Sequence, residues 1–128
     1  MQGPWIWLAI GAGGAIGAMA RHGVGALALR WLGPNFPWGT LAVNLIGSAL
    51  MGAFIAWLVA KEPHPSVVRA FIATGVLGGF TTFSTFALDA VTLYRDRTLT
   101  IAGAYVAASV IFSIAGLFAG LAAGKALS

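Results

Sequence analysis

Two otherwise apolar stretches of the sequence carry polar side chains at every fourth position. The first trio is Thr40, Asn44 and Ser48, and the second is Tyr105, Ser109 and Ser113. Because a helix turns once in about 3.6 residues, each trio falls on one helical face. Hydroxyl and amide groups at membrane depth need partners or a water-lined cavity, so the two faces could line one polar path. Alternatively, each side chain bonds back to its own helix or joins two helices.

A third apolar stretch contains the sequence GGFTTFSTF at residues 78–86. Its paired glycines each weaken a helix by up to about 1 kcal/mol. Thr81 and Thr82 are β-branched and compete for backbone hydrogen bonds. The sequence therefore predicts a helix that is broken near residues 78–82. Such breaks are tolerated at membrane depth only where they are buried in protein or line a cavity, and in transporters they form ion sites.

Two aromatic residues follow the expected break. Phe83 and Phe86 are three positions apart and therefore share a face of the helix after the break. The edges of aromatic rings carry partial positive charge, so two phenylalanine edges could line the way for a small anion. The other interpretation is packing against lipid or the protein core, which describes most phenylalanines in membrane proteins.

No acidic residue is expected at mid-membrane. Glu62 falls in a loop, Asp96 lies in a charged turn, and Asp89 is near the end of the third apolar stretch. A cation pathway or a proton-coupled exporter normally carries an embedded carboxylate, so the pattern favours an anion or a neutral solute. Arg21, late in the first apolar stretch, fits a vestibule that attracts anions, or else it snorkels to the headgroup level.

Membrane helices must position these residues. The chain has 128 residues, of which 59% are hydrophobic and 8% charged, whereas a soluble domain has about 25% charged residues. A spanning helix needs roughly 20 apolar residues. Four segments qualify, at about 5–29, 38–60, 67–93 and 98–124, and the first is read as a retained span rather than a signal peptide. The expected fold is one all-α domain, residues 1–128, with four transmembrane helices and a broken third helix.

Glycines four positions apart indicate where helices approach closely. They occur at 13 and 17, and again at 116, 120 and 124. Such spacing lets helix backbones touch in membranes, although glycine is also simply common in membrane helices.

The basic residues are almost evenly divided between the two ends of the expected spans. An even number of spans places Lys61, Arg69 and Lys125 on the side of the chain termini. The other side then holds Arg21, Arg30, Arg95 and Arg97. Orientation follows an excess of basic residues on one side, so three against four predicts insertion in both orientations and an antiparallel homodimer. The alternative is that one residue near a membrane end decides the orientation.

At these residues the chain resembles a known family, the Fluc-type (CrcB-type) bacterial fluoride channels. The resemblance rests on GGFTTFSTF, on WGTLAVNLIGS at residues 38–48, on Arg21 and on the second polar trio. It covers essentially the whole chain. It implies passive export of fluoride across the bacterial inner (plasma) membrane, two pores in each dual-topology homodimer, and a central structural sodium ion at the dimer interface.

The resemblance also implies roles for individual residues. Phe83 and Phe86 match a pair of pore phenylalanines whose rings belong to different pores, and Asn44 matches an amide that faces one ring. The backbone carbonyls of Gly78 and Thr81 match the sodium ligands, which suit a hard cation. The other matched pore residues are Thr40, Thr82, Ser84, Tyr105, Ser109, Ser113 and Arg21. Asp89 stands near the place where family members often have a glutamate.

Other classes of protein fit the sequence less well. A small dual-topology multidrug transporter has similar length and four spans, but it needs an embedded glutamate that this chain lacks. A non-transporting assembly subunit explains the size and the glycines but not the polar faces. An enzyme is not expected, because no histidine falls in a plausible cluster with an acid and a nucleophile. The scattered basic residues do not predict binding to nucleic acid.

Overall fold

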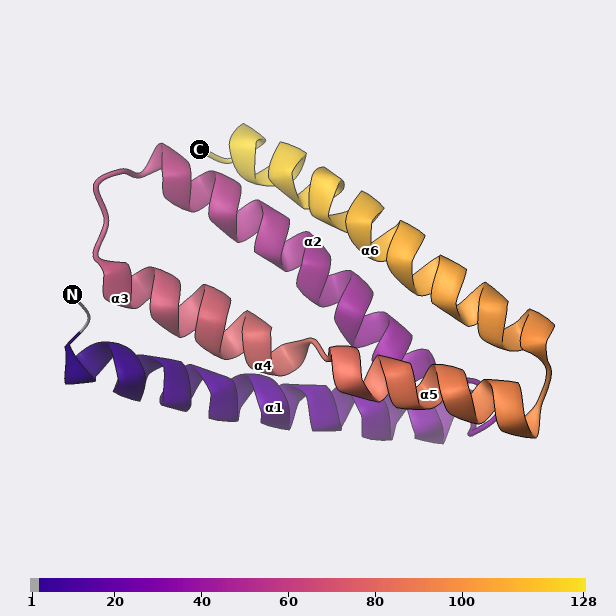
Figure 1. Ribbon diagram of the computed structural model, residues 1–128. Coiled ribbons are helices and arrows are strands. Elements are labelled where there is room, and N and C mark those ends of the chain that lie inside the picture. The colour runs from indigo at the N-terminus through magenta and orange to yellow at the C-terminus, as the bar shows by residue number, and fades with distance from the viewer. Residues whose placement is uncertain (1–2) are drawn as a thin grey trace.

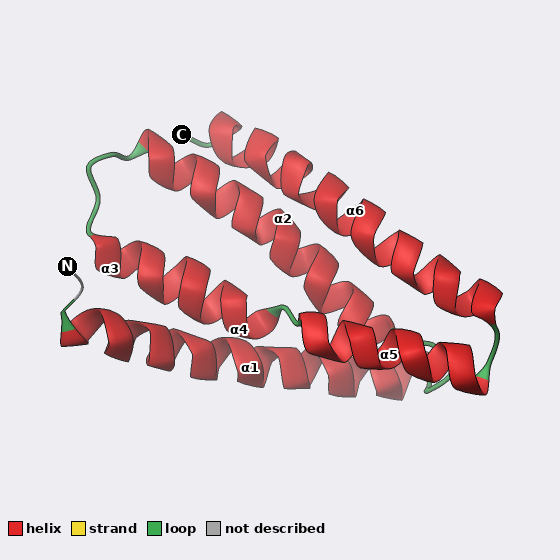
Figure 2. Cartoon of the chain, viewed as in Figure 1, coloured by secondary structure: helices red, strands yellow, loops and turns green. Residues whose placement is uncertain are grey.

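A computed structural model describes residues 3–128, which form long helices without any strand (Figure 1, Figure 2). Three of the helices are continuous: α1 (Pro4–Leu32), α2 (Trp38–Ala60) and α6 (Leu99–Ala126). The remaining pass is divided into four pieces. These are α3 (Ser66–Arg69), a π-helical segment η1 (Ala70–Leu77), α4 (Gly78–Phe80) and α5 (Phe83–Asp96). The all-α class is confirmed.

The helix ends follow from local sequence. Pro4 stands in the first turn of α1, where its missing N–H has no partner to lose. Gly33 ends α1 with a φ of 80°, and its N–H donates to the carbonyl of Leu29. This positive φ suits a residue without a Cβ. Thr98 caps α6 because its hydroxyl accepts a hydrogen bond from the Ile101 N–H.

The helices pack as two close pairs. α2 lies along α6, and α1 lies along η1 and α4. α5 extends beyond them to the first residues of α6 (Figure 1). α1 begins and α6 ends at the same end of the bundle (Figure 1), as an even number of passes requires.

Glycines let the helix backbones of both pairs approach closely. A Cβ on Gly17 of α1 would lie only 2.8 Å from the Phe80 nitrogen of α4, and one on Gly120 of α6 would lie 2.9 Å from the Ala53 nitrogen of α2. Gly13 and Gly124 face backbone in the same way, whereas Gly116 has ordinary room, with the Leu45 oxygen at 3.4 Å. The close contacts predicted from glycine spacing are therefore confirmed at most of these positions.

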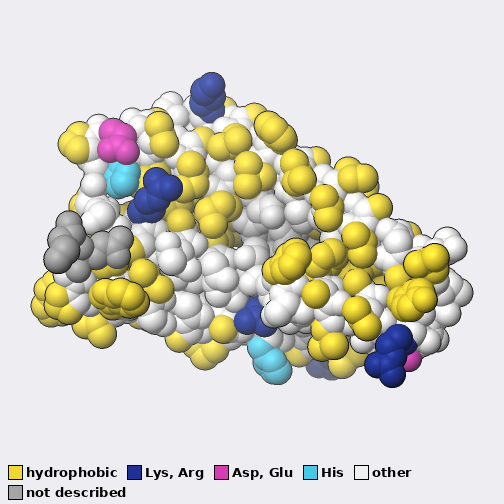
Figure 3. All heavy atoms as spheres, viewed as in Figure 1, with side chains coloured by type: hydrophobic (Ala, Val, Ile, Leu, Met, Phe, Trp, Pro, Cys, Tyr) yellow, Lys and Arg dark blue, Asp and Glu magenta, His cyan; other side chains and the backbone are white. Residues whose placement is uncertain are grey.

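Three segments of the described chain are long and apolar enough to cross a membrane: Trp38–Ala60, Ser66–Asp96 and Leu99–Ala126. Hydrophobic side chains also cover much of the visible surface in Figure 3. α1 has sufficient length, with 29 residues, but it is not among the three. Its glycines and basic residues dilute its apolar content. The first of the four predicted spans therefore stays a prediction.

The third pass is broken where the sequence predicts a break. Thr81 and Thr82 are extended, with ψ values of 159° and 120°, between the end of α4 and the start of α5. The π-helical segment before the break was not predicted. Such wider turns are rare and frequently occur near functional sites.

Candidate functional site

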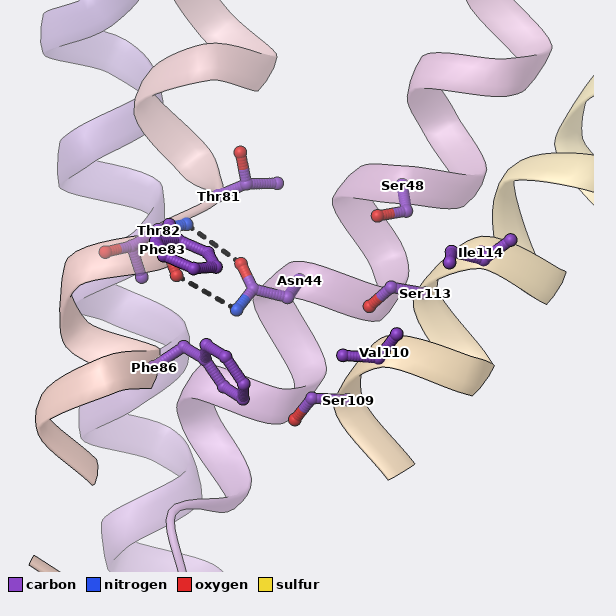
Figure 4. A pocket seen from close by; sticks show the side chains of 10 residues that line it. All are labelled: Asn44, Ser48, Thr81, Thr82, Phe83, Phe86, Ser109, Val110, Ser113 and Ile114. Carbon is purple, nitrogen blue, oxygen red and sulfur yellow. Dashed lines mark hydrogen bonds between the residues drawn. The ribbon is translucent and has the colours of Figure 1, made fainter. Parts of the chain in front are cut away.

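The break is joined to α2 through Asn44. The Thr82 N–H donates to Asn44 Oδ1 at 2.8 Å, and Asn44 Nδ2 donates to the Thr82 carbonyl at 3.1 Å (Figure 4). The side-chain amide therefore replaces the helical partners that Thr82 lost at the break. Because Thr82 offers one donor and one acceptor, this pairing also fixes which way the amide of Asn44 points.

Threonine hydroxyls make two further hydrogen bonds at the break. Thr81 Oγ1 donates to the Leu77 carbonyl at 3.0 Å, and Thr82 Oγ1 accepts from the Thr85 N–H at 3.2 Å. The second bond caps α5. The β-branched residues that signalled the break in the sequence thus also stabilise its two ends.

Arg21 reaches the break from α1. Its Nε donates to the carbonyl of Gly79 at 3.0 Å. Among residues 3–128, the carbonyls of Gly78 and Thr81 have no hydrogen-bond donor. These two oxygens are the ones that the family resemblance implies as sodium ligands.

A cavity of about 320 Å³ lies beside the break (Figure 4). α2, α5 and α6 contribute most of its wall. The lining residues are Asn44, Ser48, Thr81, Thr82, Phe83, Phe86, Ser109, Val110, Ser113 and Ile114. Uncharged donors and aromatic rings from three helices therefore surround one space at mid-span.

Ser109 stands out among the lining residues. It is only 5% exposed, and its hydroxyl has no hydrogen-bond partner among the described residues. Leaving a buried hydroxyl without a partner costs about 1–3 kcal/mol. A buried polar group of this kind calls for an explanation, and a ligand or water in the adjoining cavity supplies one.

The aromatic rings near the cavity form a short row. Phe83 and Phe86 have centroids 5.6 Å apart, and Phe86 and Tyr105 have centroids 5.4 Å apart. Tyr105 is fully buried, and its hydroxyl donates to Asp89 Oδ2 at 3.2 Å. Phe83, in contrast, is 80% exposed. A large apolar ring at the edge of a cavity thus faces outward from the chain.

The structure brings together only part of the predicted site. Asn44, Thr82, Phe83, Phe86, Ser109 and Ser113 line the cavity. Thr40 and Arg21 instead line a second cavity of about 380 Å³, which also reaches Thr82 and Thr85. Tyr105 lies behind Phe86, and Ser84 and Gly78 are exposed outside the first cavity. Thr82 is the residue common to both cavities.

Ser48 also lines the cavity, in agreement with the spacing of the first polar trio. Some other lining residues were not predicted as site residues. Val110 and Ile114 carry no chemical signal in an apolar helix. The bond between Tyr105 and Asp89 joins residues from two helices, and no local pattern in the sequence indicates it.

Comparisons with known proteins relate almost the whole chain to one family. Residues 8–121 match the family model described as CrcB-like protein, Camphor Resistance (CrcB). A protein of Agrobacterium fabrum named fluoride-specific ion channel FluC is 52% identical over 92% of this chain and 94% of its own length. A Rhizobium etli protein of the same name is 51% identical, over 94% of this chain and 96% of its own. Fluoride-specific ion channel FluC 1 of Nitrobacter hamburgensis is 46% identical, over 89% and 90%.

Proposed function

The chain belongs to the CrcB-like family, and we propose that it is a channel through which fluoride leaves the bacterial cytoplasm passively across the inner membrane. The relatives that support this proposal carry the name of a fluoride-specific ion channel. That name describes a channel rather than an enzyme. The structural observation that carries the proposal is the buried, unpaired hydroxyl of Ser109 beside a cavity of uncharged donors and rings.

The cavity chemistry suits a small, strongly hydrated anion. Fluoride gives up its water only where other donors replace it at short range. Ser109 and Ser113 offer hydroxyls, and Asn44 keeps one amide N–H beyond the bond it makes to Thr82. Because none of these groups carries a full charge, the ion is attracted without being held too tightly to leave.

The two phenylalanines would also attract an anion without carrying a full charge. Ring edges carry partial positive charge, so Phe83 and Phe86 can line an anion path without any hydrogen bond. Arg21, with Thr40, borders the second cavity, where its positive charge attracts anions towards the break. We assign Ser84 and Tyr105 supporting places on this path, at the exposed edge of α5 and behind Phe86.

An antiparallel homodimer completes the site in this proposal. Phe83, Ser84 and Gly78 are exposed along the broken pass of a single chain. Lipid cannot satisfy the polar groups of Ser84 and Gly78, whereas a second copy can cover them. Two copies related by a two-fold axis would make two equivalent pores, with Phe83 of one copy facing the pore of the other.

A sodium ion between the two copies would occupy the break. The free carbonyls of Gly78 and Thr81 supply two hard oxygen ligands from each chain, which suits such a cation. Among residues 3–128, no group of three histidine, aspartate or glutamate side chains could hold a metal instead. The ion would balance the partial negative charge of the carbonyl oxygens and hold the copies together. It would not be transported.

The decisive experiment measures fluoride efflux from liposomes that contain the purified protein. Liposomes loaded with potassium fluoride release the ion once valinomycin lets potassium balance the charge, and a fluoride electrode records the release. We expect rapid fluoride efflux with chloride efflux no faster than in protein-free liposomes. No fluoride efflux, or equal chloride efflux, would refute the proposal.

A further inference from the structure

Arg21 lies deep within α1, about three turns before the last residue of the helix. Its side chain is half-buried. A charged group at such depth is unfavourable unless it meets a partner. Among residues 3–128 no carboxylate pairs with Arg21, since the one ion pair in this range joins His64 and Glu62. The partner of Arg21 must therefore be something other than an acid.

That partner is the end of the helix before the break. Arg21 Nε donates to the Gly79 carbonyl at 3.0 Å. Gly79 belongs to the last turn before the chain leaves the helix at Thr81, so its carbonyl has lost its usual donor. The continuous helical run from Ser66 to Phe80 also places partial negative charge at this end. A cation that donates a hydrogen bond is stabilised by both effects.

The close approach of the two helices determines which nitrogen of Arg21 makes the bond. A Cβ on Gly79 would lie 3.1 Å from the Gly14 Cα and 3.3 Å from the Ala18 nitrogen, so α4 and α1 touch through backbone. At this separation the inner nitrogen, Nε, reaches the carbonyl. Nε is the only nitrogen of Arg21 with a hydrogen-bond partner among the described residues, and the side chain also lines the second cavity.

We propose that Arg21 is a positioning residue: its Nε–H holds the Gly79 carbonyl and so fixes the last helical turn before the break. This turn carries the carbonyl of Gly78, and Thr81 follows it directly. The inference goes beyond the attraction of anions assigned to Arg21 above, because it requires a hydrogen bond at one atom rather than a charge. It holds whichever ion the protein passes.

Substitutions can separate the bond from the charge. In glutamine, Nε2 is the same number of bonds from the Cα as Nε in arginine. Arg21→Gln therefore keeps a donor at this position and loses the charge. Arg21→Lys keeps the charge but has carbon where Nε was, and Arg21→Ala removes both. Arg30→Gln serves as the matched control, since Arg30 is exposed in the last turn of α1.

Hydrogen–deuterium exchange of the purified protein reports directly on the break. We compare exchange of the backbone amides from Gly79 to Phe86 in the wild type and the four variants. We expect Arg30→Gln to stay within about twofold of the wild type, and Arg21→Gln, which keeps the donor but loses the charge, to exchange only about threefold faster. Loss of a hydrogen bond to a charged group should speed exchange on the order of tenfold in Arg21→Lys and Arg21→Ala.

Two results would overturn the proposal. One is equal exchange in all variants, which would mean that the bond does not hold the break. The other is lysine protecting the break as well as or better than glutamine, which would mean that charge matters rather than the Nε donor. Fluoride efflux is a separate measurement. If the wild type passes no fluoride, the proposed function fails, and the order of exchange rates still decides the role of Arg21.

Discussion

In the proposed channel, Ser109 would link burial to transport. Its hydroxyl is buried at the cavity wall and has no partner among the described residues. A group that folding leaves unpaired can be paired by a permeating ion, so the penalty of burial becomes attraction for an anion. The same hydroxyl can also release the ion, because it carries no charge.

We predict that Ser109→Ala lowers fluoride efflux by about tenfold, the factor expected for loss of one hydrogen bond of about 1.4 kcal/mol. Folding should not suffer, because the variant removes an unpaired buried hydroxyl. The measurement is efflux from liposomes together with the thermal midpoint in detergent. Ser66→Ala, an exposed position at the start of α3, is the control. Unchanged efflux in Ser109→Ala would contradict a direct contact with the ion.

Phe83 makes a second test at the same scale. The ring is 80% exposed in a single chain, so its replacement removes little packing within that chain. We predict that Phe83→Ile lowers fluoride efflux more than tenfold, because isoleucine has no polarised ring edge. Phe118→Ile is the matched control, since Phe118 is 67% exposed on α6, away from both cavities. Equal efflux from the two variants would make Phe83 a packing residue.

At the scale of the elements, α2 packs closely against the break at Gly47. A Cβ on Gly47 would overlap the Thr81 methyl group, and it would lie 3.3 Å from Phe80 Cδ2. The hydroxyl of Thr81 meanwhile bonds to Leu77. The missing side chain of Gly47 thus leaves the space in which Thr81 sits.

This fit predicts a rescue. Gly47→Ala should destabilise the fold by about 1–3 kcal/mol through overpacking. Thr81→Ser removes the obstructing methyl and keeps the hydroxyl, so the double variant should recover most of the loss. Thermal midpoints of the wild type, both single variants and the double variant form the cycle. Simple addition of the two single effects would show that the groups do not meet.

Two glycines on α6 lead to different predictions for the thermal midpoint when each is replaced by alanine. A Cβ on Gly120 would meet the backbone of Ala49 and Ala53, whereas one on Gly103 of the same helix would have nothing within 4 Å. Gly120→Ala should therefore lower the thermal midpoint by forcing α2 and α6 apart. Gly103→Ala should leave it unchanged or raise it, because alanine favours a helix by up to about 1 kcal/mol. Equal shifts in both variants would contradict the close packing.

The elements also show what sequence patterns can and cannot predict. The break was predictable because glycine and threonine act locally on the helix. The pairing of Asn44 with Thr82 was not, because it joins residues 38 positions apart without a repeating signal. The prediction that both polar trios line one path is only partly correct, for a geometric reason. A step of four residues turns a helix by about 400°, so each step drifts by about 40°, and Thr40 and Tyr105 fall outside the first cavity.

At the scale of the whole molecule, the structure refines the charge balance. Lys61, Arg69 and Lys125 lie at the end of the bundle where α1 begins and α6 ends. Arg30, Arg95 and Arg97 lie at the other end. Arg21 belongs to neither end, because its side chain bonds to the break at mid-span. The balance thus becomes three against three, which gives the chain no electrostatic reason to prefer one orientation.

We predict that both orientations occur in one membrane. The chain has no cysteine, so Ser128→Cys supplies a single thiol at the C-terminus. An impermeant thiol reagent should label about half of the chains in sealed vesicles, and the rest only after the vesicles are opened. Adding Arg30→Gln and Arg95→Gln leaves three basic residues against one, and should move the thiol mostly to the cytoplasmic side. Labelling of Ser128→Cys from one side only, without those changes, would refute an antiparallel dimer, since such a dimer requires chains in both orientations.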